Sequence, residues 1–409
     1  MTATLSTRFK SGPAPRAGDA PPRRLPFDSV ICFGGEDWWY HNRGHYDMQM
    51  MRELSAHAPV LYINSIGMRM PRVTEGRMFL TRIERKLRSL SRGTVNVRDG
   101  FTVLSPTVIP GRLGMSVSRK LLGLQVREAA RTLGFSRPLV WVACPPAAEI
   151  AAHIRGAMMV YQRTDRYETF HNVDASAIAR YDRQLKSTAS LTLFCSSSLY
   201  EEERHQCRDA MFADHGVDYE RFAQAALRPD EPNDVRDIAR PRVGFVGGID
   251  SHTFDPGLFV DVARRMPHVQ FVLVGACSLP DGWCREENIH LLGQRPYEQV
   301  ADYMAACDVL IMPWNRSEWI RACNPVKLKE YLAVGRPVVT TWFDELRRYD
   351  GFVHIAGTPE EFAEAIQRGV DSPDDPCRLR AWVERETWTS KADAVIERLR
   401  AEFEEVRAA

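Results

Sequence analysis

Residues 313–339 hold the side chains best suited to chemistry on a phosphate-bearing ligand. Asn is a preferred N-cap and Pro suits the first helical position, so Asn324 and Pro325 predict the start of a helix. The free backbone N–H groups of Asn324 and Val326, on either side of Pro325, and the positive end of the helix dipole suit a diphosphate. Arg316 and Arg321 before the helix and Lys327 in its first turn are candidates to neutralise phosphate charge, although each also fits a solvated surface position.

Glu330 lies one turn further along the same predicted helix. Its neighbours Tyr331, Leu332 and Ala333 are typical of buried positions, so this carboxylate needs a partner. Two vicinal ribose hydroxyls would each donate a hydrogen bond to it. An ion pair with Lys327, three residues earlier on the same face, is the alternative.

Alternating strands and helices must position these residues. In the first half, short apolar runs predict strands at residues 27–33, 60–63, 101–104, 139–142, 158–161 and 191–194. In the second half they predict strands at 243–246, 271–274, 290–292, 309–312 and 337–340. Helical patterns separate these runs, which indicates an α/β protein with two Rossmann-like, doubly wound domains.

The length of 409 residues exceeds what one core usually serves, and two cores predict a cleft. We expect a disordered proline-rich tail at 1–26, a first domain at 27–227, a polar linker at 228–241, a second domain at 242–387 and a helix at 388–409 that packs back on the first domain.

Composition argues against several classes of protein. Lys and Arg number 54 and Asp and Glu 53, so bulk charge does not predict a nucleic-acid partner. Nine cysteines without a C-x-x-C pair favour buried thiols and a cytoplasmic protein, and we find neither a membrane-spanning run nor a secretory signal. The pattern at 77–92 predicts a basic amphipathic helix, which is either a solvated surface or a peripheral contact with an anionic membrane face or acceptor.

The helix segment resembles the donor helix of group-one glycosyltransferases, the family-four-like enzymes of polysaccharide and teichuronic-acid assembly. That pattern reads n-P-x-K-x-x-E-Y-x-A-x-G-x-P-V-V, and the matching residues here run from Asn324 to Val339. The resemblance extends to Asp37-Trp38-Trp39, to Tyr161 with Asp165, and to the segment His215–Asp218 followed by Phe222. It implies a GT-B fold, in which the second domain binds a nucleotide sugar and the first mainly binds the acceptor.

The resemblance also implies further site residues. Glu330 would bind ribose, and the loop with Gln294, Arg295 and Tyr297 would bind the base, which the sequence leaves open as uracil, thymine or guanine. Gly247 and Gly248 would form the first turn of the donor domain. Gly34 and Gly35, which end the first strand, would let the backbone approach the diphosphate or sugar from the opposite wall of the cleft, and a plain tight turn is the alternative.

Three departures from the family pattern bear on chemistry. The first glutamate of the family's glutamate pair is replaced by Ala322, so its usual contact with the donor sugar is missing. The loop 249–255 lacks the usual phosphate-binding Arg or Lys, for which His252, Arg316 or Arg321 are candidate substitutes. Arg163-Thr164-Asp165 stands where many relatives carry a histidine, which makes Asp165 a candidate contact for the sugar or acceptor hydroxyl; capping of the next helix is its alternative.

Together these residues and the resemblance predict a metal-independent hexosyltransferase. It would move a sugar from a UDP, TDP or GDP sugar to a hydroxyl or amine of a small-molecule, lipid-linked or saccharide acceptor. The resemblance favours retention, in which the departing phosphate acts as base, and an inverting transfer with Asp165 as base is the alternative. No D-x-D motif is present, so we expect no metal ion, and side chains must stabilise the charge on the leaving diphosphate. The candidate catalytic residues are Asp165 at the sugar or acceptor and Arg316 and Lys327 at the diphosphate. The alternatives are a degenerate nucleotide-sugar-binding protein, a pseudo-glycosyltransferase or a sugar-nucleotide epimerase. A nicotinamide dehydrogenase fits less well, because the glycines after Val243 read G-x-x-G-G.

Overall fold

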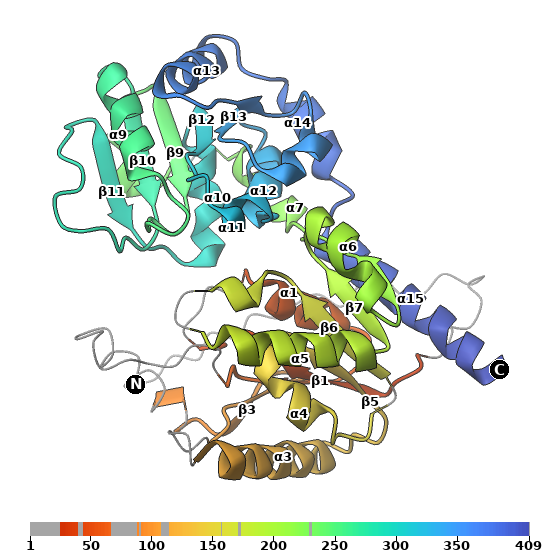
Figure 1. Ribbon diagram of the computed structural model, residues 1–409. Coiled ribbons are helices and arrows are strands. Elements are labelled where there is room, and N and C mark those ends of the chain that lie inside the picture. Colours follow the sequence, from red (N-terminus) through yellow and green to blue (C-terminus); the bar gives the residue numbers. More distant parts are fainter. Residues whose placement is uncertain are drawn as a thin grey trace.

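The computed structural model describes residues 25–39, 44–66, 88–89, 91–107, 114–156, 158–170, 173–228 and 231–408. It shows two lobes, each built on one sheet (Figure 1). The predicted tail at 1–26 and the predicted basic helix at 77–92 lie almost wholly outside the described residues.

The first lobe contains an eight-stranded sheet. In spatial order its strands are β3 (Thr94–Arg98), β4 (Phe101–Leu104), β2 (Val60–Ile63), β1 (Ser29–Phe33), β5 (Pro138–Val142), β6 (Met158–Arg163), β7 (Leu191–Phe194) and β8 (Ala210–Phe212). All neighbours pair in parallel except β3, which runs antiparallel to β4. Its helices are α1 (Tyr46–Leu54), α3 (Gly114–Thr132), α4 (Ala148–Ala151), α5 (Ala175–Thr188) and α6 (Ser197–Glu203).

The second lobe contains a six-stranded, fully parallel sheet. Its strands in order are β11 (Ile289–Gly293), β10 (Gln270–Val274), β9 (Arg242–Val246), β12 (Val309–Met312), β13 (Val338–Thr340) and β14 (His354–Ile355). Its helices are α9 (Pro256–Arg265), α10 (Tyr297–Ala305), α11 (Glu318–Arg321), α12 (Val326–Val334), α13 (Pro359–Asp371) and α14 (Pro376–Val383). The described residues also form the 3₁₀ helices η2 (Pro145–Ala147), η3 (Tyr167–Thr169), η4 (Arg204–Gln206) and η5 (Asp344–Tyr349).

Apolar side chains on both faces explain why each sheet is covered on both sides. In β1, Val30 and Cys32 join one buried cluster, whereas Ile31 and Phe33 join another on the opposite face. Clusters on the two faces of the second sheet are arranged in the same way. The predicted α/β class with parallel sheets is therefore confirmed.

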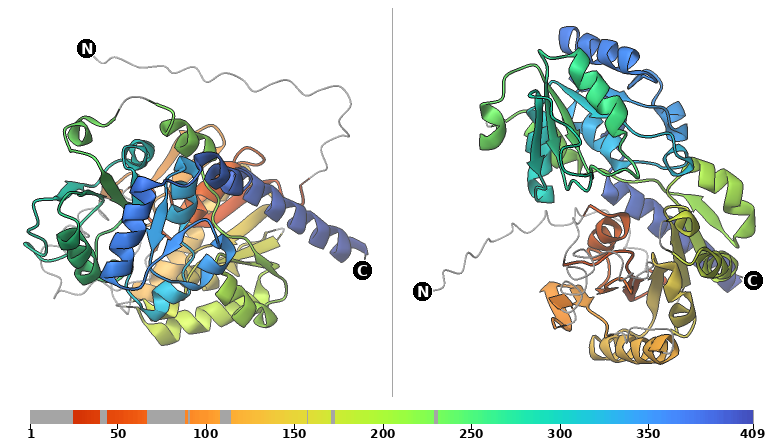
Figure 2. Two further views of the ribbon diagram at one scale, coloured as in Figure 1. Left: turned by 90° about the horizontal axis from the view of Figure 1, so that it is seen from above. Right: turned by 60° about the vertical axis from the view of Figure 1, so that its left-hand side comes forward.

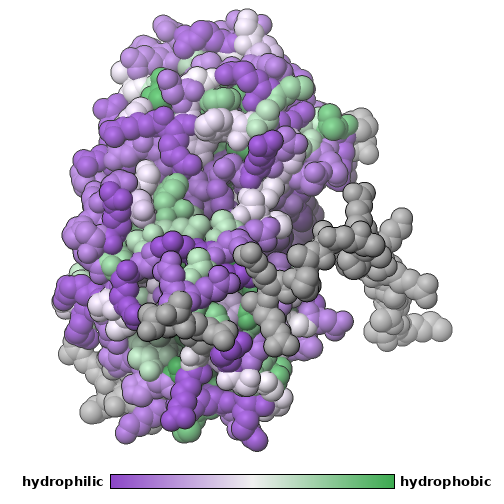
Figure 3. Space-filling view, turned by 90° about the vertical axis from the view of Figure 1, so that its right-hand side faces the viewer, coloured by the Kyte–Doolittle hydropathy of each residue, from purple (hydrophilic) through white to green (hydrophobic). Residues whose placement is uncertain are grey.

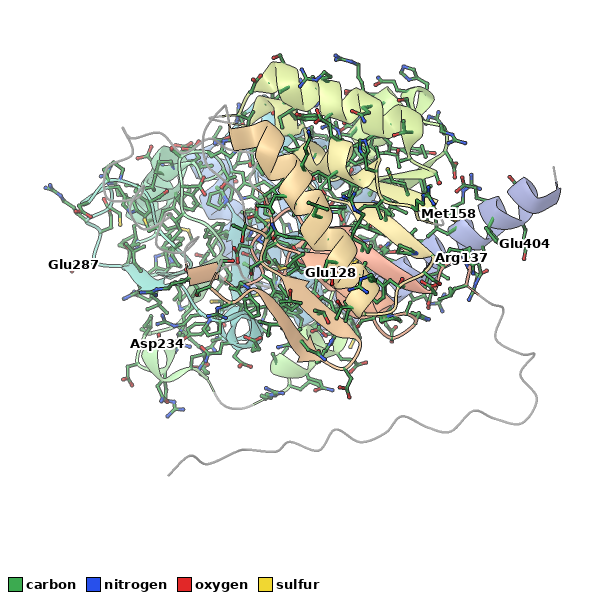
Figure 4. The ribbon with its side chains drawn as sticks, turned by 90° about the horizontal axis from the view of Figure 1, so that it is seen from below. Glu128, Arg137, Met158, Asp234, Glu287 and Glu404 are labelled. Carbon is green, nitrogen blue, oxygen red and sulfur yellow. The ribbon has the colours of Figure 1, made fainter. Side chains whose placement is uncertain are left out.

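Two connections join the lobes. The chain passes from the first to the second through α7 (Tyr219–Ala225) and α8 (Asn233–Arg236). It returns through α15 (Trp388–Ala408), which runs along the first lobe (Figures 1 and 2) and buries Trp388, Val395 and Leu399 in the core of that lobe. Arg137, just before β5, lies over the ring of Phe403 near the end of α15, and Figure 4 shows Arg137 next to this helix.

The side face in Figure 3 carries mostly hydrophilic residues, with more hydrophobic ones gathered in a band across its middle. No helix in the described ranges is long and apolar enough to cross a membrane.

Candidate functional site

The N-terminus of α12 lies where the two lobes touch. The helix begins at Val326 with Pro325 as N-cap and no side-chain cap, so the predicted Asn324 cap is wrong. Instead, the Asn324 side-chain amide donates to the carbonyl of Cys195, which follows β7 in the first lobe, at 2.7 Å. The helix ends at Gly335, whose φ of 77° gives the left-handed C-cap that glycine adopts without strain.

Lys327 in the first turn of α12 lies against the turn that ends β9. A Cβ added to Gly247 would come within 2.3 Å of Lys327 Cε, so only glycine allows this approach. The Val246 N–H donates to the Tyr331 hydroxyl at 2.9 Å, which fixes α12 to β9. The structure thus brings together Gly247 and Lys327, two residues that the sequence analysis assigned to the diphosphate.

Glu330 is buried, with 6% of its surface exposed. Burial raises the pKa of its carboxyl to about 7, although the Lys327 charge and a hydrogen bond with Tyr297 lower it. In α12 it is Lys329 that forms ion pairs, with Asp214 and Glu386. The alternative prediction, an ion pair between Lys327 and Glu330, is not observed. Among the described residues the Glu330 carboxylate forms no ion pair, and it lies next to Tyr297.

The predicted base-binding loop is only partly open to a ligand. Arg295 is paired with Asp234 of α8 and donates to the Tyr303 hydroxyl at 2.8 Å. The guanidinium of Arg221 lies 5.4 Å from the Tyr297 ring centre, which leaves less of that ring for stacking. Gln294 is exposed.

Asp165 follows β6 and approaches the second lobe. Burial raises the pKa of its carboxyl to about 6, while the Arg163 charge lowers it. Burial raises the pKa of the Cys323 thiol, and the Asp165 charge raises it further, so Asp165 is close enough to the loop before α12 to interact with it. The 3₁₀ helix that follows has no side-chain cap, so the capping alternative for Asp165 is not observed.

A buried charge cluster that the sequence analysis missed anchors the Asp165 loop. Arg163 is fully buried and donates through both terminal nitrogens to Glu168 at 3.0 Å. It also contacts Glu203 at 3.1 Å and Asp182 at 3.3 Å. This set fixes both ends of residues 163–168, and no local pattern could have identified partners 19 and 40 positions away.

Gly34 and Gly35 form a tight turn after β1. A Cβ on Gly34 would come within 2.1 Å of the Tyr62 hydroxyl oxygen. The Gly35 N–H and the Tyr62 hydroxyl both donate to one Asp47 oxygen at 2.8 Å. Asp47 and Tyr62, which the sequence analysis did not select, therefore hold this turn in place.

Three other predicted phosphate contacts lie elsewhere in the second lobe. His252 is next to the Trp319 ring, with a centroid distance of 4.9 Å. Arg316 donates to the Gly357 carbonyl at 2.6 Å, and Arg321 pairs with Glu318 at 3.3 Å. Both arginines line a pocket that does not include Lys327 or Gly247. Gly248 is exposed beside Asp250.

A second buried charge cluster joins the lobes directly behind the site. The Lys329 ammonium donates to Asp214 at 2.8 Å, to Glu386 at 2.7 Å and to the His215 carbonyl at 2.6 Å. Asp214 also accepts from Lys391 at 2.7 Å. Burial raises the pKa of the Asp214 carboxyl, but the charges of Lys329 and Lys391 outweigh this effect and hold the pKa well below its usual range. No local sequence pattern indicates this cluster, because its members come from three separate segments.

No group of three or more His, Cys, Asp or Glu that could hold a metal ion occurs among the residues with described positions.

Comparisons with known proteins agree with this arrangement. Residues 240–372 match the family model of glycosyl transferases group 1. A teichuronic acid biosynthesis glycosyltransferase of Bacillus subtilis, TuaH, is 25% identical over 226 residues, which are 50% of this chain and 55% of that protein. The chain thus matches about half the length of this curated relative.

Solved structures share the fold over most of the chain. The UDP-forming α,α-trehalose-phosphate synthase from Burkholderia vietnamiensis has a TM-score of 0.62 and 14% identity, covering 92% of this chain and 100% of that one. Anabaena Alr3699/HepE in complex with UDP-glucose has a TM-score of 0.58 and 15% identity, covering 93% and 98%. Sucrose-phosphate synthase from Thermosynechococcus elongatus has a TM-score of 0.57 and 13% identity, covering 93% and 98%. The predicted GT-B fold and the resemblance to group-one glycosyltransferases are confirmed.

Proposed function

We propose that this chain, with its group-one glycosyltransferase domain, transfers a sugar from a nucleoside diphosphate sugar to an acceptor hydroxyl or amine, with retention and without a metal ion. One observation carries the proposal most strongly. In α12 a buried carboxylate that forms no ion pair with a described residue, Glu330, lies one turn after Lys327, which packs on the Gly247 turn. A carboxylate and an ammonium at this separation suit the ribose and the diphosphate of one ligand.

The donor would bind along the N-terminal end of α12. Ribose hydroxyls would donate to Glu330, and the diphosphate would face Lys327 and the N–H groups of Val326 and Lys327, which have no intrahelical acceptors because they belong to the first turn. Glycine at position 247 lets the ligand and Lys327 share this space. The base would then lie towards Tyr297, whose hydroxyl already contacts Glu330.

The reaction needs the negative charge on the departing diphosphate to be stabilised. Without a metal, Lys327, the helix dipole and backbone N–H groups would do this. In a retaining transfer the departing phosphate takes the proton of the acceptor, so Asp165 need only hold a hydroxyl of the reacting sugar. Its place near Cys323 and the missing glutamate position, Ala322, supports that role.

The donor base and the acceptor define finer parts of the proposal. Alr3699/HepE has been solved with UDP and with UDP-glucose, which favours testing uridine donors first, before thymidine and guanosine. For the acceptor we propose a saccharide, lipid-linked or free. We also propose that the enzyme acts in the cytoplasm, with residues 77–92 as its contact with the inner membrane face.

Ala322 favours a second candidate function. If Asp165 does not replace the lost glutamate, the chain binds nucleotide sugars without transferring the sugar. Binding with no release of free nucleoside diphosphate, with any saccharide acceptor, would support this alternative.

The experiment is a thermal-shift titration with uridine, thymidine and guanosine diphosphate sugars, on the wild-type protein and Glu330→Ala. A ligand that binds the native state raises the melting temperature by mass action. We expect a selective shift that Glu330→Ala loses, whereas the exposed control Glu318→Ala keeps it. A shift with a nicotinamide dinucleotide and none with a nucleotide sugar would refute the proposal.

A further inference from the structure

A pocket of about 400 Å³ lies at the carboxyl edge of the second sheet, beside α11. Small-molecule sites usually have volumes of about 300–1,000 Å³. The residues that line it are Arg316, Ser317, Ile320, Arg321, Thr341, Trp342, Ile355, Ala356 and Gly357. Neither Lys327, Glu330 nor Gly247 is among them, so the pocket is separate from the donor contacts proposed above.

The pocket carries positive charge without a carboxylate in its lining. Arg316 donates through Nη2 to the Gly357 carbonyl at 2.6 Å, which orients the guanidinium and leaves its other nitrogens to a ligand. The Arg321 side chain is 61% exposed, and its carboxylate partners are long, at 3.3 Å to Glu318 and 3.9 Å to Asp344. Two planar, permanently charged guanidinium groups that line one small pocket favour the binding of an oxyanion.

The pocket also presents an aromatic surface. Trp342 and Ile355 are each 46% exposed, which is unusual for large hydrophobic side chains in this chain. A pyranose ring has an apolar face and a polar edge of hydroxyl groups. The Trp342 indole can pack against the apolar face while the arginines meet the polar groups. Ser317 and Thr341 add hydroxyl groups to the lining.

The position of the pocket points to the acceptor. Trp342 lies three residues before Glu345, whose carboxylate accepts from the Ser197 N–H of the first lobe. Arg321 lies three residues before Asn324, which donates to Cys195 of the first lobe. The pocket is therefore next in sequence to two of the contacts that the second lobe makes with the first, which is the proposed acceptor lobe.

We propose that this pocket binds an anionic sugar unit of the acceptor, one that carries a carboxylate or a phosphate group. This inference rests on the proposed function, because it assigns the acceptor class of the same enzyme. Arg316 and Arg321 hold the anion, and Trp342 packs on the sugar ring.

The test is a set of calorimetric titrations of the full chain with D-glucuronate, D-glucose 6-phosphate and neutral D-glucose. We expect at least one of the two anionic sugars to bind at least about tenfold more tightly than glucose, since hydrogen bonds from a guanidinium group to an oxyanion are charge-assisted. The tighter of the two identifies the anion. Arg321→Ala and Trp342→Ala should each weaken that binding by about tenfold.

Two matched controls are available in the same lobe. Arg368 is 62% exposed with an ion-pair partner on its own helix, and Trp382 is 42% exposed and stacks on Phe352. Arg368→Ala and Trp382→Ala should bind the anionic sugar as the wild type does. Equal losses in the control and test variants, or no binding of either anionic sugar to the wild type, would overturn the inference.

A parallel titration with the best nucleotide sugar separates the two proposals. If the nucleotide sugar binds and the anionic sugars do not, the proposed function stands and the acceptor inference fails. Displacement of the anionic sugar by UDP would make the pocket part of the donor site and would also overturn the inference. If anionic sugars bind but no nucleotide sugar does, both the proposed function and the acceptor role fail.

Discussion

Replacing Glu330 with glutamine should separate the stability of the protein from its donor binding. Burial raises the pKa of the Glu330 carboxyl from an ordinary 4.5 to about 7. A carboxyl with a raised folded-state pKa contributes stability at low pH, and that contribution disappears as the pH rises through the folded-state value. The difference between 4.5 and about 7 corresponds to about 3 kcal/mol of unfolding free energy.

Glutamine is neutral at every pH, so Glu330→Gln lacks this loss. Relative to the wild type, the variant should gain about 2.5 kcal/mol between pH 5 and pH 8. The measurement is urea unfolding followed by tryptophan fluorescence at both pH values. At pH 8 the difference should shrink by most of its size in the presence of donor, since a ligand at one hundred times its Kd adds about 2.7 kcal/mol to the protein that binds it.

The same titration gives the pH dependence of donor binding. If ribose binds the ionised carboxylate, the affinity of wild-type protein for a nucleotide sugar should fall by up to about tenfold per pH unit below about 7, and the variant should show no such step. A constant stability difference between the two proteins from pH 5 to pH 8 would refute the reasoning, because it would mean that Glu330 is not desolvated.

Three further substitutions test neighbouring contacts. Gly247→Ala places a Cβ 2.3 Å from Lys327 Cε, so it should displace that flexible side chain and weaken donor binding about tenfold in calorimetry, with little change in melting temperature. Lys329→Met leaves the buried Asp214 carboxylate without one of its cations and should cost about 3 kcal/mol in urea unfolding. Asp165→Asn should lower kcat/KM about a hundredfold and remove an acidic limb near pH 6 from its pH profile.

Each of these predictions has a result that would contradict it. Gly257→Ala, where the nearest atom to an added Cβ is 3.4 Å away, is the control for Gly247→Ala, and equal donor affinity in the two variants would remove Lys327 from the diphosphate site. An unchanged unfolding free energy in Lys329→Met would show that the charge cluster does not stabilise the junction of the lobes. Full activity of Asp165→Asn would exclude that carboxylate from the reaction.

The strands were predictable because continuous apolar runs bounded by turns leave few alternatives. β1, β5 and β12 are buried on both faces, and all three follow from their runs of valine, isoleucine and leucine. The short or exposed strands β3, β8 and β14 were missed, since β3 is an edge strand with partly exposed residues and β14 has only two residues.

Side-chain partners were less predictable than elements. Asn324 has the chemistry of an N-cap, but its amide instead bridges to the first lobe. Arg316 and Arg321 are candidate phosphate contacts from their place in the loop before α12, and in the structure both line another pocket. Lys329 and Asp214 are 115 positions apart, so their contact depends on how the two lobes meet.

The central claim is that α12 and the Gly247 turn bind a nucleoside diphosphate sugar. The most direct measurement is calorimetric titration of the wild-type protein with UDP-glucose, repeated with Glu330→Ala and with the control Glu318→Ala. We predict one donor per chain in the wild type and the control, and at least about tenfold weaker binding in Glu330→Ala. Equal affinity for UDP-glucose in all three proteins would contradict the assignment of the site. If UDP-glucose and the thymidine and guanosine diphosphate sugars all failed to bind the wild type, that result would contradict the proposed function itself.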